Sequence, residues 1–584
     1  MAQLEASSPP PNDGDELDRF IPREIRAQLE ERYWRPIERA TVAESFLSDE
    51  GFFADPGSHP ATFSDHGVVH VRDVARRAVQ LVDQLDGGLL RSRPPARRRI
   101  LEGSAVLMAY LHDIGMVAAT PAGRRVHPQY AAQTPLGDGF DDLADQLWST
   151  DSAGLRSRIE AAGLATTAIP GDVVLREVLA LSLCHSKSAV PAHLLDDPVS
   201  LRALMIKGSF TSLDRQADEP RDALRSSRFD GIDPAPFVAR YHDVTSDAFG
   251  WLVDPRPTAR EFVVDVIDSI RVLRAADALR QRGTTQRTSA GYEICVDRRT
   301  GRAVMAVRSS DRRFGAIVWL DTQYSIAEGN LRQVEMTAAG SLRVAFHRGD
   351  FTGDGSIDRV VTASVSTIAD FEADVLGSFR PAPNAPRAER FVEVVPPPDN
   401  PEFATLVTEA LEAHYPRLGG RTRLVDEPHP VPRREVAAWY RRGAAVGDDQ
   451  HEIDRWFTQL GRHGLNIDTI DRRAALRDVR RSRLHAGEVV LSPGTAASVV
   501  VIPLESGARV DPVGGYRSEP LHPWIPIGVT GVVRGAERNA AVVAETEVDV
   551  LAIPAERYLS DWFRPYTADQ LRTAWSQWLA LGRG

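Results

Sequence analysis

Hydrophobic residues recur at intervals of three and four over the first half of the chain, which is the spacing of one face of an α-helix. Residues 68–85 follow this spacing most closely, with Val71, Val74, Ala78 and Val82 on one face. An amphipathic helix is therefore predicted there. Further helices with the same spacing are predicted at 100–112, 173–184 and 262–279.

The pattern changes after Gly283, where short stretches rich in Val, Ile and Thr alternate with turns. Residues 292–296 and 303–307 are typical of two strands joined by a turn, and residues 341–346 and 359–365 of a second pair. Together with a strand at 391–395 and a helix at 403–414, they predict a small α+β domain.

Helical spacing returns after a Pro-rich linker, and short strands then alternate with Gly and Pro turns up to a closing helix at 567–581. We therefore predict a multidomain chain with an all-α domain, a small α+β domain, and a C-terminal β-roll with flanking helices. The expected parts are a disordered lead-in at 1–16, the all-α domain at 17–289, the α+β domain at 290–424, a linker with helices at 425–483 and the β-roll at 484–584.

Composition limits the classes of function. The 584 residues are too many for one hydrophobic core, and the net charge of −11 argues against a broad nucleic-acid-binding surface. Cys184 and Cys295 are the only cysteines, so we expect no disulfide framework and a reducing, cytoplasmic compartment. No stretch of about 18 apolar residues is present, so no membrane span is expected.

Potential metal ligands interrupt the apolar helices. His112 and Asp113 are adjacent at the end of a strongly apolar segment, and Asp277 lies in the middle of another. A buried carboxylate or His–Asp pair is costly without a cation or strong hydrogen bonds. Neutral imidazoles and ionised carboxylates both bind divalent cations, so a metal site explains these residues better than a helix cap does.

The order His, His-Asp, His, His, Asp along the chain resembles the HD superfamily of metal-dependent phosphohydrolases. The resemblance implies one or two divalent ions, which would be Mn, Fe, Mg, Co or Zn. It also implies a catalytic role for Asp113. The core ligands would be His70, His112, Asp113 and Asp277.

The resemblance extends to further side chains. His127, in a His-Pro segment, and His185 would hold a second cation or bind substrate phosphate, or else support the other ligands. His66 would orient ligands or protonate a leaving group. Lys187 would neutralise a phosphate, although a solvated surface lysine is the alternative. No Gly-Tyr-Pro element follows His185, so the cyclic-dinucleotide hydrolysis of the HD-GYP subfamily is not expected.

Residues 484–563 resemble the cyclic-nucleotide-binding fold. Residues 527–542 match its phosphate-binding cassette in length and in the positions of Gly528 and Arg538, which are the candidate ligand-binding residues. Val529 stands where competent members have a Glu that binds the ribose hydroxyl. Cyclic-nucleotide binding should therefore be weak or absent. A degenerate sensor, a different ligand, or a packing and oligomerisation module all stay open.

The HD resemblance implies hydrolysis of a phosphate ester or phosphodiester by metal-activated water, with a C-terminal regulatory module. The expected partner is a nucleotide or another phosphorylated small molecule, and a homo-oligomer stays open. Two alternatives remain. One is a non-catalytic binding or assembly protein that retains an HD fold, and the other is a cyclic-nucleotide-responsive regulator.

Overall fold

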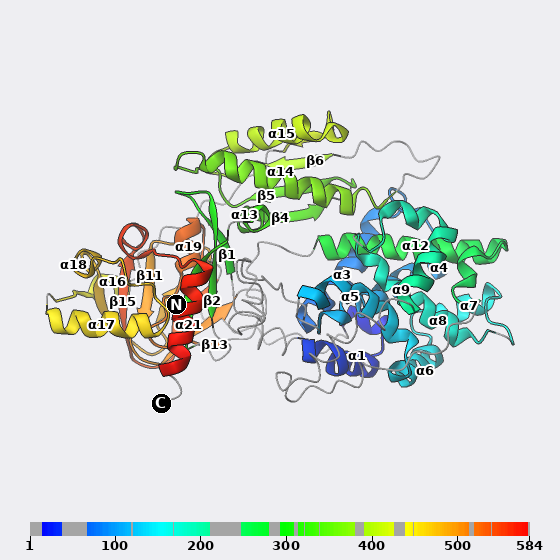
Figure 1. The fold of residues 1–584 in the computed structure, drawn as a ribbon, viewed down its shortest axis with the longest axis horizontal. Helices are drawn as coiled ribbons and strands as arrows, with labels where there is room; N and C mark the ends of the chain where they lie inside the picture. Colours follow the sequence, from blue (N-terminus) through cyan, green and yellow to red (C-terminus); the bar gives the residue numbers. More distant parts are fainter. Residues whose placement is uncertain are drawn as a thin grey trace, which may run out of the picture. The chain divides into compact units, whose positions relative to one another are not determined.

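The chain forms two compact units in a computed structural model (Figure 1). Unit 1 comprises residues 1–38, 66–280 and 377–387, and unit 2 comprises residues 39–65, 281–376 and 388–584. Most of the expected lead-in, residues 1–14, lies outside the described residues. The structure describes residues 15–37, 67–117, 121–167, 169–187, 189–210, 247–279, 293–308, 313–320, 322–337, 339–379, 391–425, 438–447, 449–512, 519–538 and 540–581.

Unit 1 consists of helices and their connections in its described residues (Figure 1). Its three longest helices, α3 (Val68–Leu85), α4 (Pro95–Ala109) and α12 (Pro257–Ala278), pack against one another. None of the helices in the described residues is long and apolar enough to cross a membrane. The remaining α-helices of this unit are α1 (Arg23–Leu29), α5 (Pro121–Gln133), α6 (Asp141–Thr150), α7 (Leu155–Ala161), α8 (Gly171–Ala180) and α9 (Pro198–Phe210).

The predicted helix at 68–85 is confirmed, and its apolar face is buried. The helix predicted at 100–112 instead ends at Ala109, because Tyr110 caps it and the Tyr110 carbonyl accepts a hydrogen bond from Trp34 Nε1 at 3.0 Å. This tertiary hydrogen bond takes a carbonyl that one more helical turn would have used. His112 and Asp113 therefore lie in the turn that follows α4.

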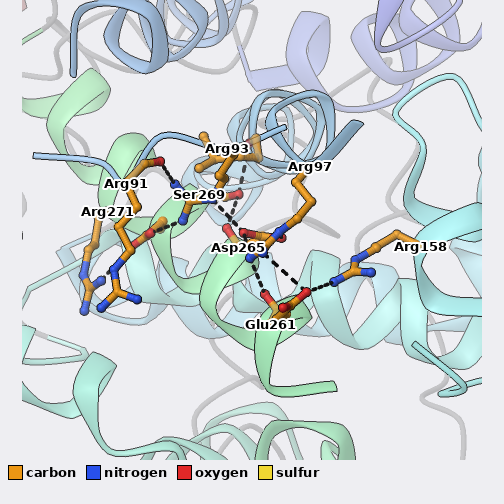
Figure 2. A network of polar contacts seen from close by, with 10 residues as sticks. Arg91, Arg93, Arg97, Arg158, Glu261, Asp265, Ser269 and Arg271 are labelled. Carbon is orange, nitrogen blue, oxygen red and sulfur yellow. Dashed lines mark hydrogen bonds and ion pairs between the residues drawn. The ribbon is translucent and has the colours of Figure 1, made fainter. Parts of the chain in front are cut away.

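Buried ion pairs hold α12 in place (Figure 2). Asp265 is fully buried and accepts from Arg93 Nε at 2.7 Å and from Arg97 Nε at 2.8 Å. One turn further along α12, Asp268 binds Arg93 and, at 2.6 Å, Arg271. Removing one partner of such a buried pair costs about 3–5 kcal/mol, because the other charge is left uncompensated. The network therefore fixes α12 against the first turn of α4 and the segment that leads into it.

A single buried carboxylate joins α8 to the segment before α12. Glu177 accepts hydrogen bonds from the Phe249 backbone N–H and from Trp251 Nε1, both at 2.9 Å. Phe249 has a φ of 53°, a strained left-handed conformation for a bulky residue. Burial raises the pKa of Glu177 to about 7, although both hydrogen bonds act to lower it.

This raised pKa predicts a pH-dependent stability. The folded chain retains the Glu177 proton between about pH 4.5 and about pH 7, where the unfolded chain has lost it, so the free energy of unfolding should fall by roughly 2–3 kcal/mol over that interval. Glu177→Gln cannot ionise and should lack this decline. Chemical denaturation at a series of pH values, with a chelator present, measures the difference.

Glu160→Gln is the matched control for this measurement, because Glu160 is exposed on the neighbouring helix α7. It should retain the wild-type pH dependence. The explanation is wrong if Glu177→Gln and the wild-type chain lose stability equally as the pH rises.

A three-stranded antiparallel sheet opens the described part of unit 2. Its order is β1 (Glu293–Asp297), β2 (Arg302–Arg308), β3 (Gly315–Leu320). The two strands predicted at 292–296 and 303–307 are confirmed as β1 and β2, with Glu293 opposite Ala306 and Asp297 opposite Arg302.

A second sheet has the order β4-β5-β6-β7, with β4 antiparallel to β5 and the remaining pairs parallel. The strands predicted at 341–346 and 391–395 are confirmed as β5 and β6, and the helix predicted at 403–414 as α15. The elements are β4 (Leu331–Met336), β5 (Leu342–Phe346), β6 (Val392–Val395), β7 (Thr422–Leu424), α13 (Gln323–Asn330), α14 (Ser356–Val375) and α15 (Glu402–His414).

The prediction of a strand at 359–365 is wrong, because these residues lie inside the helix α14. Their β-branched residues favour a strand locally. Over the whole of α14, however, the buried residues Val360, Ala363, Thr367 and Phe371 recur at helical spacing. The parallel pairing of β5 with β6 also requires a crossover connection, and α14 lies within it.

The C-terminal part of unit 2 contains two open four-stranded antiparallel sheets, as expected for a β-roll. Their orders are β10-β14-β12-β13 and β11-β15-β9-β8. A buried apolar cluster that includes Val501, Val510, Val542 and Val550 draws on strands of both sheets. The strands are β8 (Ala444–Ala445), β9 (Arg480–Leu484), β10 (Val489–Leu491), β11 (Val499–Pro503), β12 (Ala508–Pro512), β13 (Glu519–Pro520), β14 (Ala540–Ala544) and β15 (Val548–Pro554).

Helices flank these two sheets in the described residues. The short helix α19 (Val529–Arg534) lies between β13 and β14 in the sequence. The predicted closing helix is confirmed as α21 (Ala568–Leu581). The others are α16 (Ala438–Arg442), α17 (Gln450–Arg462), α18 (Arg472–Ala475) and α20 (Ala555–Arg557).

Candidate functional site

Six side chains from five segments of unit 1 converge on one place. Two groups of donor atoms form there, each with its atoms within 4.8 Å of one another, and Asp113 belongs to both. His70 comes from α3, Asp277 from α12, and His112 and Asp113 from the turn after α4. The first group is His70, His112, Asp113 and Asp277, and the second is Asp113, His127 and His185.

The first group has its nitrogen and oxygen atoms in close approach. His70 Nε2 lies 3.3 Å from His112 Nε2 and 3.4 Å from Asp113 Oδ2. Asp277 Oδ1 lies 3.9 Å from His70 Nε2 and 3.8 Å from His112 Nε2. Two imidazoles and two carboxylates are a donor set that suits a divalent transition metal.

The second group uses the other oxygen of the same carboxylate. Asp113 Oδ1 lies 3.3 Å from His127 Nε2 and 3.2 Å from His185 Nε2, and the two Nε2 atoms are 3.2 Å apart. Asp113 therefore presents Oδ2 to the first group and Oδ1 to the second. A carboxylate in this position can serve as a ligand that two cations share.

Backbone carbonyls determine which imidazole nitrogens face the site. His112 Nδ1 donates to the Ala109 carbonyl at 2.7 Å, and His185 Nδ1 donates to the Ser182 carbonyl at 2.7 Å. In the neutral rings these bonds leave the lone pair on Nε2, which points into the site. Two Nε2 lone pairs at such short distances repel each other unless a cation or a proton lies between them. The residues present therefore fit a bound metal ion.

The charges in the site are strongly coupled. Burial alone would raise the pKa of Asp113, but the charge of His112 and hydrogen bonds from the neighbouring histidines hold that pKa well below its usual range. Burial alone would lower the pKa of His112, but Asp113 outweighs it and raises that pKa well above the usual value. Burial lowers the pKa of His185, despite the neighbouring Asp113. Hydrogen bonding to His112 outweighs burial and lowers the pKa of Asp277.

The six side chains of the site differ in how much of each is exposed to solvent. The side chains of His70, His112, Asp113 and His185 are between 0% and 6% exposed. His127 is 19% exposed and Asp277 is 31% exposed. Of the six side chains, His127 and Asp277 therefore have the most contact with solvent.

The sequence did not indicate that Trp34 contacts the site. Trp34 lies shortly before residues 38–66, which are outside the described residues. Its ring centre lies 6.5 Å from that of His70 and 6.1 Å from that of His112. Trp34 is fully buried and forms part of the apolar wall behind these two ligands. No motif around this residue could have indicated the contact, because it depends on how the first helix packs.

Two of the predicted catalytic residues, His66 and Lys187, are not among the described side chains that converge on the site. His66 lies outside the described residues. Lys187 is exposed in the turn that follows His185, and its phosphate-binding role stays a prediction.

The segment that resembles a phosphate-binding cassette has its arginine buried against its own backbone. Arg538 is 6% exposed, and its guanidinium donates to the Gly528 carbonyl at 2.8 Å and to the Val499 carbonyl. Burial lowers its pKa to about 10. Gly528 has a φ of 79°, and a Cβ there would lie 2.1 Å from Arg538 Nη1. Val529, the residue after Gly528, is buried in an apolar core cluster.

Comparison with known proteins gives matches to solved structures. No family model matches the chain, and no curated protein matches it. One matching structure is a cyclic nucleotide-binding-like protein from Brucella abortus, at 19% identity over 15% of this chain and 78% of that chain, with a TM-score of 0.14. Another is the catabolite activator protein of Thermus thermophilus, at 19% identity over 20% of this chain and 56% of that chain, with a TM-score of 0.15.

A third match is a cAMP-binding acyltransferase from Mycobacterium smegmatis, at 18% identity over 18% of this chain and 35% of that chain, with a TM-score of 0.15. These are proteins of the kind that residues 484–563 resemble. Similarities of this size establish neither a ligand nor an activity for this chain.

The donor set predicts that divalent metal ions stabilise the wild-type chain. Binding to the folded state alone adds about 2.7 kcal/mol at a free metal concentration of 100 times Kd. Asp113→Asn should abolish most of this gain, because it removes the one negative charge that both groups share. Differential scanning fluorimetry with Mn²⁺, before and after chelation, measures the shift in Tm.

Asp145→Asn is the matched control, since Asp145 is an exposed carboxylate on α6 outside both groups. It should respond to Mn²⁺ like the wild-type chain. Equal stabilisation of Asp113→Asn and the wild-type chain would show that the ions bind elsewhere.

Proposed function

We propose that this chain is a metal-dependent phosphohydrolase that cleaves a phosphate ester or phosphodiester, with a nucleotide as substrate. One observation carries the proposal. The buried Asp113 directs one oxygen to His70 and His112 and the other to His127 and His185. This arrangement provides two adjacent groups of metal ligands around one carboxylate.

The donor chemistry supports hydrolysis of a phosphate. Divalent cations bound at paired groups of this kind supply Lewis acids that lower the pKa of water towards about 7 and stabilise negative charge on phosphoryl oxygens. The protein contributes the fixed positions of the ligands. Hydrogen bonds from Nδ1 of His112 and His185 to backbone carbonyls orient both rings before any substrate arrives.

The exposure of the ligands suggests how a substrate approaches. His70, His112, Asp113 and His185 are almost fully buried, whereas His127 and Asp277 are partly exposed. A phosphoryl group would enter past these two side chains and meet the ligands from one side. The resemblance to HD phosphohydrolases, which rests on the same residues, points to the same chemistry.

An assembly protein that retains the helical fold for packing alone is the alternative. Burying Asp113 among four imidazoles has a desolvation cost that apolar residues of similar volume would avoid. A buried carboxylate surrounded by oriented ligand atoms favours a functional site over a purely structural one.

Asp113→Ala provides the direct test of the proposed activity. Phosphate release from nucleoside phosphates, cyclic nucleotides and dinucleotides is measured with Mn²⁺, Fe²⁺, Mg²⁺, Co²⁺ or Zn²⁺. Loss of both groups should reduce kcat/KM by about 10³-fold or more, since metal ions contribute several kcal/mol of transition-state stabilisation. Asp145→Asn should keep the full activity.

Equal hydrolysis by the wild-type and Asp113→Ala chains would disprove the site assignment. A wild-type chain that is purified and reconstituted without binding any of these metals would disprove the enzyme proposal itself.

We also propose that the C-terminal module regulates or packs and does not act as an ordinary cyclic-nucleotide receptor. The Arg538 guanidinium already donates to two carbonyls of its own chain, and Val529 lies in the core. The end of α19 is joined to the preceding sheets of unit 2. Arg534 Nη2 donates to the Ile294 carbonyl at 2.7 Å, and Arg348 Nη1 donates to the Arg534 carbonyl at 2.7 Å.

Isothermal titration calorimetry with cAMP and with cGMP should therefore give no saturable binding to the wild-type chain. Arg538→Ala should lower the free energy of unfolding, because each buried carbonyl left without its donor costs about 1–3 kcal/mol. Saturable binding of either nucleotide that Arg538→Ala abolishes would instead support the cyclic-nucleotide-responsive regulator.

A further inference from the structure

We propose that Arg274 is a positioning residue. It fixes His185 in the second donor group and so holds His185 Nε2 beside Asp113, the ligand that the two groups share. The inference rests on the proposed metal centre. Arg274 lies on α12, three residues before the ligand Asp277, and is 4% exposed. It is therefore a buried cation within one helical turn of a ligand of the first group.

The guanidinium of Arg274 binds the backbone on both sides of His185. Its Nε donates to the Cys184 carbonyl at 2.5 Å, and its Nη2 donates to the Val190 carbonyl. The Cys184 carbonyl belongs to the peptide group that joins Cys184 to His185. One planar side chain thus determines the orientation of the peptide plane directly before the ligand.

The Cys184 carbonyl needs a partner of this kind. It lies near the end of the 3₁₀ helix Leu181–His185, where carbonyl groups have no partner within the helix. Cys184 is fully buried, so water is not a ready substitute. A cationic donor at a helix C-terminus also interacts favourably with the helix dipole.

The same short helix orients the imidazole. His185 Nδ1 donates to the Ser182 carbonyl, so the ring is fixed to the helix that Arg274 holds. A tilt of this helix would move His185 Nε2 away from Asp113 Oδ1, from which it is 3.2 Å distant. The first group does not depend on this turn, because its ligands come from α3, α12 and the turn after α4.

Arg271 provides a matched comparison on the same helix. It lies one turn before Arg274 and is also largely buried, but it binds carboxylates, with Asp268 at 2.6 Å and Asp196 at 2.7 Å. Figure 2 shows it within the ion-pair network of α12. Both arginines tie α12 to its surroundings, but Arg271 donates to carboxylates, whereas Arg274 donates to the peptide group before His185.

The test counts Mn²⁺ ions per chain in the wild-type, Arg274→Lys, Arg274→Met and Arg271→Met chains. The wild-type chain should bind two ions and give the EPR signal of a spin-coupled pair. Arg274→Met should retain the first ion, bind the second about 10–100-fold more weakly, as is usual when a residue behind a metal ligand is lost, and lose the coupled signal. Arg271→Met should be less stable but keep both ions and the signal.

Arg274→Lys keeps the buried charge and so guards against a variant that does not fold. A lysine ammonium cannot reproduce the planar pair of donors, so the affinity for the second ion should still fall, though by less than in Arg274→Met.

Unchanged affinity for the second ion in Arg274→Lys or Arg274→Met would overturn the inference. An equal loss in Arg271→Met would also overturn it, since the effect would then be a general disturbance of α12. A wild-type chain that binds a single ion would end this inference but leave a one-ion phosphohydrolase intact. A wild-type chain that binds none would end both proposals.

Discussion

The buried carboxylate of Asp113 is the constraint on which the structure of the helical unit depends. The Asp113 side chain is only 6% exposed, so its charge must be compensated, and the Nε2 atoms of four imidazoles lie within 3.4 Å of its two oxygens. Two helices (α3 and α5), the turn after α4 and the 3₁₀ helix Leu181–His185 meet to supply these atoms. Because the same carboxylate faces both donor groups, a shift of any one element would disturb the compensation of the charge. The packing of the helices and the geometry of the site therefore depend on each other.

The surrounding residues fix the orientation of the ligand side chains. Carbonyls of Ala109 and Ser182 set the imidazole tautomers of His112 and His185, and Trp34 closes the apolar side of the site. The ion pairs along α12 hold the helix that carries Asp277. These interactions involve residues behind the ligands, and they are formed before any ion or substrate binds.

The C-terminal module also contains a buried charge, which hydrogen bonds within the protein compensate. In its cassette a guanidinium is also buried, but carbonyls of Gly528 and Val499 satisfy it. Val529 is buried in an apolar core cluster of this module. The helix α19 is bonded to β1 through Arg534.

Residue patterns along the chain were sufficient to predict the elements whose signal is local and repeated. The helix at 68–85 and the β1–β2 hairpin follow from spacing and turn residues, and the order of histidines and aspartates indicated the donor set. Tertiary structure decided where local signals conflict or are silent. It made 359–365 part of a helix, because burial over the whole of α14 outweighs a β-branched run. It alone brought Arg274 to the Cys184 carbonyl, since that contact joins residues 90 positions apart and leaves no periodic trace in the sequence.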